Sequence, residues 1–273
     1  MKNNNITVGY LTYITENNKN FRLKHYQNSI KSFLSLIENF NCISVDNNSI
    51  REVKNDLKFY DFKSFFHSLK NFYDIFLFYM TYWEALKHNH DYVLFSYDDF
   101  ICNEKSTEML LATTEFMDKN IDVGCCRVAA YSLTNKNNYD CNIVSKNINP
   151  DSVRHFNTAT NCNLEWFSEE KVNGYLFSKT NWHYTSRPTC WRMNVLKKIM
   201  FDELENVPIL QGFEKLMAQR FAKTNYLVGV LDVGMMNTTS VSDSARTNEL
   251  STNKEMSIHI DINEMLDFYK KNI

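Results

Sequence analysis

Glycine and proline are scarce in this sequence, at 6 and 3 of 273 residues. No stretch rich in Pro, Gly or Ser divides the chain, and no internal repeat is visible, so the sequence gives no sign of a linker between domains. The length suits one large α/β domain or two small ones. Because 44% of the residues are hydrophobic and 14% aromatic, we expect a sizeable core and no global disorder.

Signals for export, membrane insertion and nucleic-acid binding are also missing. The seven cysteines form no CxxC pair, and an odd, unpatterned count fits a reduced, cytoplasmic protein. The N-terminal MKNNNITVGYLTY lacks the apolar core of a signal peptide. The longest apolar run, FYDIFLFYMTYWEAL, contains Asp74 and Glu84 and is shorter than the roughly 20 residues that span a bilayer. A net charge of −2 gives no general attraction to nucleic acid or anionic lipid.

Several catalytic signatures are absent as well. No G-x-G-x-x-G follows the first expected strand, and there is no Walker A sequence. The chain has no G-x-S-x-G nucleophile elbow, no HExxH and no paired Cys/His spacing for zinc. These absences argue against dinucleotide-dependent, P-loop, serine-hydrolase and zinc-hydrolase chemistry.

Strands and helices are expected to alternate along the chain. Helices are predicted over 23–39, 71–90, 106–120, 212–223 and 263–272, and strands over 6–15, 41–49, 92–97, 122–130 and 226–236. Residues 188–201 begin extended and turn helical, 131–180 are polar and irregular with loops and one or two strands expected, and 237–254 are expected to be mobile. Residues 50–70 show no clear pattern. The alternation predicts an α/β fold with a mostly parallel sheet and helices on both faces.

Paired carboxylates follow the buried strand YVLFSYDDFICN, where Asp98 and Asp99 stand between apolar residues. Burying such charge is costly unless a cation or hydrogen-bond donors meet it. Asp46 closes another strand in SVDNNS, and ligands of open α/β sheets bind where parallel strands end. Two structural alternatives stay open: SVDNNS is also typical of an Asx turn, and Asp98–Asp99 of a helix N-cap.

Four segments in order resemble glycosyltransferase family 2 over roughly residues 6–240. SVDNNS resembles the family's VDNGS, and DYVLFSYDDF the region of its Asp-x-Asp motif. PTCWRMNVLKKIMFDE resembles the acceptor-side segment, and QGFEKLMAQR the GEDYDLxxR helix, with Glu214 and Arg220 at the matching positions. The resemblance implies a GT-A fold, Rossmann-like, over residues 1–240. Residues 1–130 would bind the nucleotide sugar and 131–240 the acceptor, followed by a small extension, 241–273, with a flexible segment and a helix.

The sequence departs from that family at three places. Tyr97 stands where the first Asp of Asp-x-Asp usually lies, which leaves Asp99 as the expected metal ligand. Phe213 and Glu214 replace the usual Glu-Asp pair. No His follows the last strand, where Asn237 and Thr238 stand instead.

The resemblance implies a role for each candidate residue. Glu214 would be the general base of an inverting transfer, and Asp99 would hold Mn²⁺ or Mg²⁺, which prefer oxygen ligands. The donor is expected to contact Thr12, Tyr13, Asp46, Asn48 and Asp98. The acceptor is expected to contact Trp182, His183, Arg187 and Trp191, because aromatic faces stack on sugars and Arg binds phosphate. Glu214 is equally typical of an exposed first helical turn, and His183 of a partly buried structural histidine.

The sequence therefore predicts a cytoplasmic glycosyltransferase, a hexosyltransferase that uses a nucleotide sugar such as a UDP-sugar. Its acceptor would be a glycan or a lipid-linked saccharide in surface polysaccharide biosynthesis, such as capsule or lipopolysaccharide. Peripheral attachment at the inner face of the membrane stays open. Two alternatives remain: a non-catalytic GT-A-like protein that binds glycan or nucleotide, and a nucleotidyltransferase. The second would normally carry a Gly-rich loop and a Lys near the first strand, and GYLTYITENN has neither.

Overall fold

The computed structural model describes residues 5–130, 165–181, 188–200, 207–209, 217, 220–238, 258–260 and 262–273. The helices are α1 (Lys19–Ser32), α2 (Leu34–Asn39), α3 (Arg51–Leu57), α4 (Tyr73–Lys87), α5 (Ser106–Lys119), α7 (Met193–Met200) and α10 (Ile262–Asn272). The longer strands are β1 (Ile6–Thr12), β2 (Asn41–Asn47), β3 (Ser64–Ser68), β4 (Tyr92–Tyr97), β6 (Val123–Arg127), β8 (Trp166–Val172), β9 (Tyr175–Thr180), β10 (Thr189–Arg192) and β12 (Leu227–Leu231). The short strands are β5 (Phe100–Cys102), β7 (Ala129–Ala130), β11 (Val207–Ile209), β13 (Met236–Thr238) and β14 (Ile258–Ile260).

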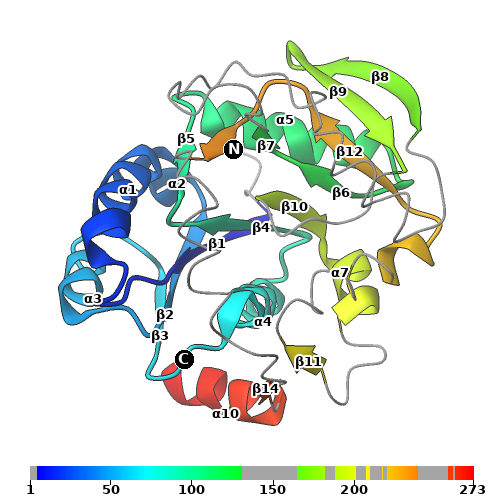
Figure 1. Cartoon of the computed structure of the whole chain (residues 1–273). Coiled ribbons are helices and arrows are strands. Elements are labelled where there is room, and N and C mark those ends of the chain that lie inside the picture. Colours follow the sequence, from blue (N-terminus) through cyan, green and yellow to red (C-terminus); the bar gives the residue numbers. More distant parts are fainter. Residues whose placement is uncertain are drawn as a thin grey trace.

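A large mixed sheet organises the molecule (Figure 1). Its nine strands within the described residues lie in the order β3-β2-β1-β4-β10-β6-β12-β9-β8. Strands β3, β2, β1 and β4 are mutually parallel, β10 runs against β4 and β6, and β12 is parallel to β6. Only β10 and β9 run against the other seven strands. The predicted α/β fold with a mostly parallel sheet is therefore confirmed.

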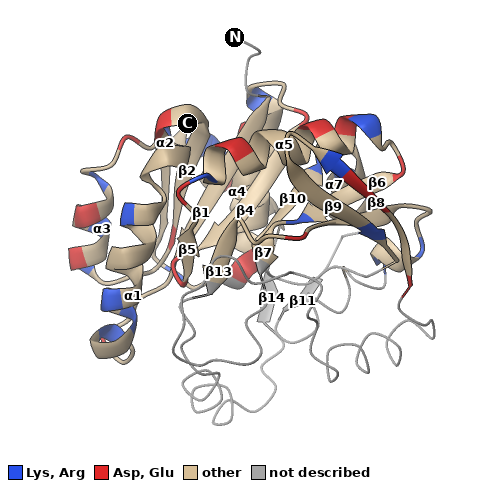
Figure 2. Cartoon of the chain, turned by 90° about the horizontal axis from the view of Figure 1, so that it is seen from above, with Lys and Arg blue, Asp and Glu red and all other residues tan. Residues whose placement is uncertain are grey.

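Helices cover both faces of this sheet, and the strand register shows which helices share a face. Val8 pairs with Leu94, Leu94 with Cys190, and Cys190 with Cys126. This row lies on the face covered by α1 and α5. Tyr10, two residues along β1, packs on Phe33 after α1, and Phe116 of α5 lies over Gly229, the residue paired with Cys126. The opposite face of β1 carries α4, with α10 packed beyond it (Figure 1). Figure 2 shows the charged residues on the outer helices and the β8–β9 hairpin, while β1 and β4 carry none.

Helix α4 is apolar around most of its circumference because it lies between two layers. Its side toward the sheet packs closely on β1: a Cβ built on Gly9 would lie 2.1 Å from Thr81 Oγ1. Its other side meets α10, where Phe76 contacts Phe268 and Trp83 contacts Tyr269 at ring-centroid distances of 5.3 and 5.5 Å. A helix buried on two sides shows little amphipathic pattern. No helix in the described part of the chain is long and apolar enough to span a membrane.

Most predicted elements within the described residues are present, with some differences. The strand expected over 226–236 is the shorter β12, and most of the helix expected over 212–223 lies outside the described residues. The helix expected over 23–39 is two helices, α1 and α2, separated at Phe33. The unassigned residues 50–70 contain α3 and β3. Of the segment expected to be mobile, residues 237–238 form the end of β13, and 239–254 lie outside the described residues. Residues 131–164 also lie outside them, while 165–180 form the β8–β9 hairpin.

The proposed division into a donor half and an acceptor half stays a prediction. In the large sheet, β10 from the second half lies between β4 and β6 from the first. Residues from the two halves therefore share one sheet and one core.

Candidate functional site

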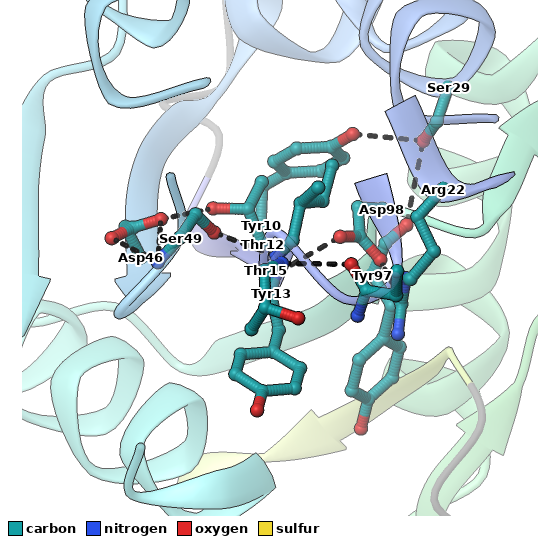
Figure 3. Close-up of polar contacts among 12 residues, drawn as sticks. Tyr10, Thr12, Tyr13, Thr15, Arg22, Ser29, Asp46, Ser49, Tyr97 and Asp98 are labelled. Atoms are coloured by element: carbon teal, nitrogen blue, oxygen red, sulfur yellow. Dashed lines mark hydrogen bonds and ion pairs between the residues drawn. The ribbon is translucent and has the colours of Figure 1, made fainter. Parts of the chain in front are cut away.

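Three parallel strands end side by side at one edge of the large sheet. Thr12, the last residue of β1, is paired with Asp46 of β2, and Leu11 is paired with Tyr97, the last residue of β4. Figure 3 shows the side chains that gather there, with Asp46 on one side of the β1 end and Asp98 on the other. The edge therefore brings together candidate residues from three segments that are distant in the sequence.

Asp46 is fully buried, with 0% of its surface exposed. Its carboxylate accepts hydrogen bonds from Thr12 Oγ1 at 3.0 Å and from the Ser49 backbone N–H at 3.2 and 3.3 Å. Lys54 Nζ of α3 lies 3.5 Å from its Oδ1. Each of these contacts joins Asp46 to a protein group, so in this structure the carboxylate holds β1, the turn after β2 and α3 together.

The turn after β2 uses each residue of Asn47–Asn48–Ser49 differently. Asn47 is buried, and its Oδ1 accepts the backbone N–H of Phe72 at 2.6 Å, at the start of α4. Asn48 is exposed and has a φ of 67°, in the left-handed region that Asn tolerates better than most residues. Ser49 Oγ accepts the Ile14 backbone N–H at 3.0 Å. The Asp46 side chain thus bonds the turn backbone three residues on, not two as in the Asx turn that SVDNNS suggested, and only Asn48 of these residues faces solvent.

Asp98 is held on both carboxylate oxygens. Oδ2 accepts the Tyr13 backbone N–H at 3.0 Å, and Oδ1 forms an ion pair with Arg22 of α1 (Figure 3). Its own backbone N–H donates to Leu11 O at 3.0 Å. Burial raises the pKa of the Asp98 carboxyl, and the neighbouring Asp99 adds to the rise, whereas Arg22 and the Tyr13 N–H oppose it. No N-cap hydrogen bond is formed, since β5 and not a helix follows.

Asp99 lies in the turn between β4 and β5 and is only half-buried. Burial lowers the pKa of His25 on α1, and the nearby charge of Asp99 opposes that shift. Tyr13, also half-buried, follows β1, and Figure 3 shows its ring pointing the same way as the ring of Tyr97. Tyr13 and Asn48 among the predicted donor contacts, and Asp99 as the predicted metal ligand, therefore retain exposed surface.

Three residues at this edge were missed by the sequence analysis. Arg22 and Lys54 supply positive charge to Asp98 and Asp46. His67 of β3 is paired with Asp46 across the strands, and burial lowers its pKa. Arg22 and His67 carry no sequence signal of their own. Lys54 has an indirect signal. Ser49 and Glu52 form an S-x-x-E pattern, which predicts the start of a helix and so places Lys54 on that helix.

The acceptor-side residues fall into two groups. Trp182, His183, Arg187 and Glu214 lie outside the described residues. Trp191 lies in β10 with 0% exposure and packs edge-on against Phe221 at 5.7 Å, so in this structure its indole belongs to the core.

The two arginines of the resembling segments contact backbone. Arg192 Nε donates to Val123 O at 2.9 Å, and its guanidinium also reaches Met117 O at the end of α5. Arg220 Nη1 donates to Ile199 O at 2.8 Å, near the end of α7. Both side chains place positive charge where helix carbonyls end, which is favourable for helix stability.

The described residues fit a divalent cation held by one carboxylate. No group of three or more His, Cys, Asp and Glu in the described ranges could hold a metal by itself. Asp99 is half-buried and offers hard carboxylate oxygens, and Asp98 is only 3% exposed. Mg²⁺ and Mn²⁺ are commonly bound by one or two carboxylates together with waters and substrate phosphates. Asp99 is therefore the residue that would hold the ion.

Comparisons with known proteins give structural matches only. No family model matches the sequence, and no curated protein matches it. The chain is similar in structure to S. aureus TarS 1-349, with 15% identity over 90% of this chain and 63% of that chain and a TM-score of 0.47. A second S. aureus TarS structure matches with 14% identity over 89% of this chain and 38% of that chain and a TM-score of 0.46.

A mannosyltransferase, PcManGT from Pyrobaculum calidifontis in complex with GDP-Man and Mn²⁺, is a third match. Its identity is 12%, over 46% of this chain and 36% of that chain, with a TM-score of 0.34. The chain thus spans less than two thirds of the length of each of these proteins.

Proposed function

We propose that this protein is a glycosyltransferase whose nucleotide-sugar donor binds at the edge where β1, β2 and β4 end. The observation that carries the proposal is that the ends of β1, β2 and β4 converge at that edge, where β2 and β4 lead into two of the segments that resemble the family. Thr12 bonds Asp46, the Tyr13 N–H bonds Asp98, and Asp99 follows directly in the chain. Ligands of open α/β sheets bind at such carboxyl ends, and the resemblance to glycosyltransferase family 2 rests on the same residues.

The donor-site residues divide by exposure into two roles. Tyr13, Asn48 and Asp99 retain exposed surface and would touch the donor. Asp46 and Asp98 are 0% and 3% exposed and would hold the walls of the site in place. Because Asp46 has no exposed surface, a donor base could bond it only if neighbouring groups moved. A divalent ion on Asp99 would neutralise charge that develops on the leaving diphosphate.

Transfer would further require a base and an acceptor site. We assign the base to Glu214, which would remove the proton from the attacking hydroxyl and so invert the anomeric centre. A base in this role accelerates transfer by about 10²–10⁴-fold. We assign acceptor contacts to Trp182, His183 and Arg187. A Glu214→Gln variant that still binds donor but loses transfer would support the assignment, and one that transfers normally would contradict it.

The setting of the reaction stays a prediction. It includes a UDP-sugar donor, a glycan or lipid-linked acceptor, surface polysaccharide synthesis and a cytoplasmic location. Hexosyl transfer in particular depends on donor-pocket detail near Tyr13 and Asn48.

Donor binding can be tested by a thermal-shift panel of nucleotide sugars with and without Mn²⁺. A ligand at 100 times its Kd stabilises the folded state by about 2.7 kcal/mol, so a true donor should raise the melting temperature clearly. Asp99→Asn should abolish the Mn²⁺-dependent part of the shift. Asp91→Asn is the matched control, because Asp91 is an exposed carboxylate that precedes β4 at its other end. No shift with any nucleotide sugar would refute the donor site.

One observation favours a second candidate, a non-catalytic binding protein. Tyr97 replaces a carboxylate at the end of β4, and a site with one carboxylate holds a metal less tightly than a site with two. Donor hydrolysis separates the candidates. An enzyme should release nucleotide from the donor and lose this activity in Asp99→Asn, whereas a binder should show no release in either form.

A further inference from the structure

The turn that carries Asp98 and Asp99 joins two different sheets. Strand β4 before the turn belongs to the large sheet, whereas β5 after it belongs to a small sheet of the order β5-β13-β7. Within the small sheet, Cys102 of β5 is paired with Met236 of β13. The position of the two carboxylates therefore depends on how β5 is held relative to β4.

Helix α1 contacts both sides of this turn through two serines that lie one helical turn apart. Ser29 Oγ accepts the Tyr10 hydroxyl of β1 at 3.0 Å and makes a longer contact of 3.5 Å to the Tyr97 carbonyl of β4 (Figure 3). Ser32 Oγ accepts the Cys102 backbone N–H of β5 at 2.9 Å and donates to Ser29 O at 2.7 Å. One hydroxyl therefore holds α1 to the large sheet, and the other holds it to β5.

Ser32 has a close counterpart three residues further along the chain. Ser32 is the last residue of α1, Ser35 lies in α2, and both side chains are half-buried. Ser35 Oγ bonds Thr107 Oγ1 at 2.9 Å and Ser106 Oγ at 3.2 Å, both in α5. The two serines thus have similar surroundings, but the bonds of Ser32 reach β5 and those of Ser35 reach α5.

We infer that Ser32 is a positioning residue for the proposed metal ligand, because it fixes β5 and with it the turn that presents Asp99. This inference rests on the proposed donor site. Mg²⁺ requires oxygen ligands at about 2 Å in near-octahedral geometry, so a less firmly held turn should bind a divalent ion less well. The donor contacts proposed for Tyr13 and Asn48 lie on the turns after β1 and β2. Among the described residues, no hydrogen bond of Ser32 reaches those two turns.

The inference predicts that loss of this hydroxyl affects the metal ion more than the nucleotide. Removing one hydrogen bond changes an equilibrium constant by about fivefold. Ser32→Ala should therefore raise the Mn²⁺ concentration that half-saturates the nucleotide-bound protein by about fivefold, while the affinity for nucleotide in EDTA stays within about twofold. The amides of residues 100–102 should exchange hydrogen about fivefold faster.

Two matched variants separate positioning from general stability. Ser35→Ala removes a hydroxyl of similar burial and bonding, so it should lose comparable stability. It should nevertheless leave the Mn²⁺ half-saturation and the exchange of residues 100–102 unchanged. Ser32→Thr keeps a hydroxyl at the same position and should stay within about twofold of the wild type in each measurement.

The experiment combines two calorimetric titrations with hydrogen exchange of the ligand-free protein. Mn²⁺ is titrated into each variant saturated with UDP, or with GDP if the donor panel selects a GDP-sugar, and the same nucleotide is titrated in EDTA. A weaker Mn²⁺ response and faster exchange confined to Ser32→Ala would support the inference.

Three outcomes would overturn it: equal Mn²⁺ responses in Ser32→Ala and Ser35→Ala, a nucleotide affinity in EDTA that falls as much as the Mn²⁺ response, or a Ser32→Thr variant that behaves like Ser32→Ala. Failure of the wild type to bind any nucleotide sugar with Mn²⁺ would instead overturn the proposed function. Unchanged exchange of residues 100–102 in Ser32→Ala would overturn the positioning role whether or not a nucleotide binds.

Discussion

At the scale of single residues, the turn after β2 shows how one short motif serves two purposes. Asp46 and Asn47 point inward and hold backbone groups of neighbouring segments, while Asn48 alone is exposed. The sequence shows a polar cluster at a strand end, which is typical of both a turn and a ligand site. Only the contacts show which side chains are committed to the turn.

The two asparagines of this turn should respond differently to substitution. Asn47→Ala removes the acceptor for the Phe72 N–H at the start of α4 and should lower the free energy of unfolding by about 1–2 kcal/mol. Asn48→Gly should change it by no more than about 0.5 kcal/mol, because glycine adopts a φ of 67° without strain. Urea denaturation of both variants measures the difference. Equal losses of unfolding free energy in the two variants would contradict the structural role of Asn47.

At the scale of elements, the contact between α4 and β1 depends on a missing side chain. Gly9 faces Thr81 and Leu77, and a Cβ there would lie 2.1 and 2.7 Å from their nearest atoms. The helix can therefore sit close above the middle of the sheet. β1 ends at the candidate site and α4 begins there. The contact between them therefore also positions Tyr13 and Asn47.

Gly9→Ala should destabilise the protein by crowding this contact. Overpacking of a filled core typically costs about 1–3 kcal/mol, and thermal or urea unfolding would measure the loss. Gly174→Asn is the control: Gly174 has a φ of 86° with no atom near its missing Cβ, and Asn tolerates this region. The free energy of unfolding of this control variant should fall by less than about 1 kcal/mol. A Gly9→Ala protein as stable as the wild type would show that α4 can move away.

Helix α10 is tied to α4 by a buried carboxylate. Glu84 accepts hydrogen bonds from Tyr269 Oη of α10 and from Ser64 Oγ of β3, both at 3.1 Å. The Tyr269 ring also stacks on Phe66 at 5.4 Å. A polar contact inside an aromatic layer fixes the position of a helix that apolar packing alone would leave less specified.

Tyr269→Phe should lower the free energy of unfolding by about 1–3 kcal/mol, because it removes a hydrogen bond to a buried carboxylate and keeps the ring. Tyr175→Phe is the matched control, since Tyr175 donates to Glu108 at 3.2 Å in an exposed setting. The free energy of unfolding of the Tyr175→Phe variant should change by no more than about 0.5 kcal/mol. Both are measured by urea denaturation, and similar losses would argue against a special role for the Glu84 contact.

At the scale of the whole molecule, half-buried histidines link stability to pH. Burial lowers the pKa of His25, His67 and His90 below the ordinary value of 6.5. The unfolded chain therefore takes up protons near pH 6.5 that the folded protein resists, so stability is present above this pH and declines as pH falls through it. Around His67, Lys54 and Lys58 add to the shift and Asp46 opposes it.

Melting temperatures measured from pH 7.5 to 5.5 should fall toward the acid end. His67→Gln removes one contributing group and should make the decline shallower. An unchanged slope in that variant would show that His67 does not contribute, and a melting temperature that rises on acidification would contradict the sign of the effect.

The sequence alone determined the fold class and the order of most elements, because apolar periodicity and strand composition are local properties of the chain. It indicated that Asp46, Asp98 and Asp99 close strands, since polar residues directly follow apolar runs there. It missed α3 and β3, where short segments carry little periodic signal, and it did not distinguish the core position of Trp191 from a ligand contact.

Only the tertiary structure decided which of these residues have protein partners. Arg22 pairs with Asp98, 76 residues away in the sequence, and Lys54 pairs with Asp46, 8 residues away. Neither pairing follows from spacing along the chain. Strand order and register bring these groups together, and both depend on contacts that close over the whole chain. For that reason the sequence could propose a site at the strand ends, while the structure assigned fastening to Asp98 and left Asp99 half-exposed.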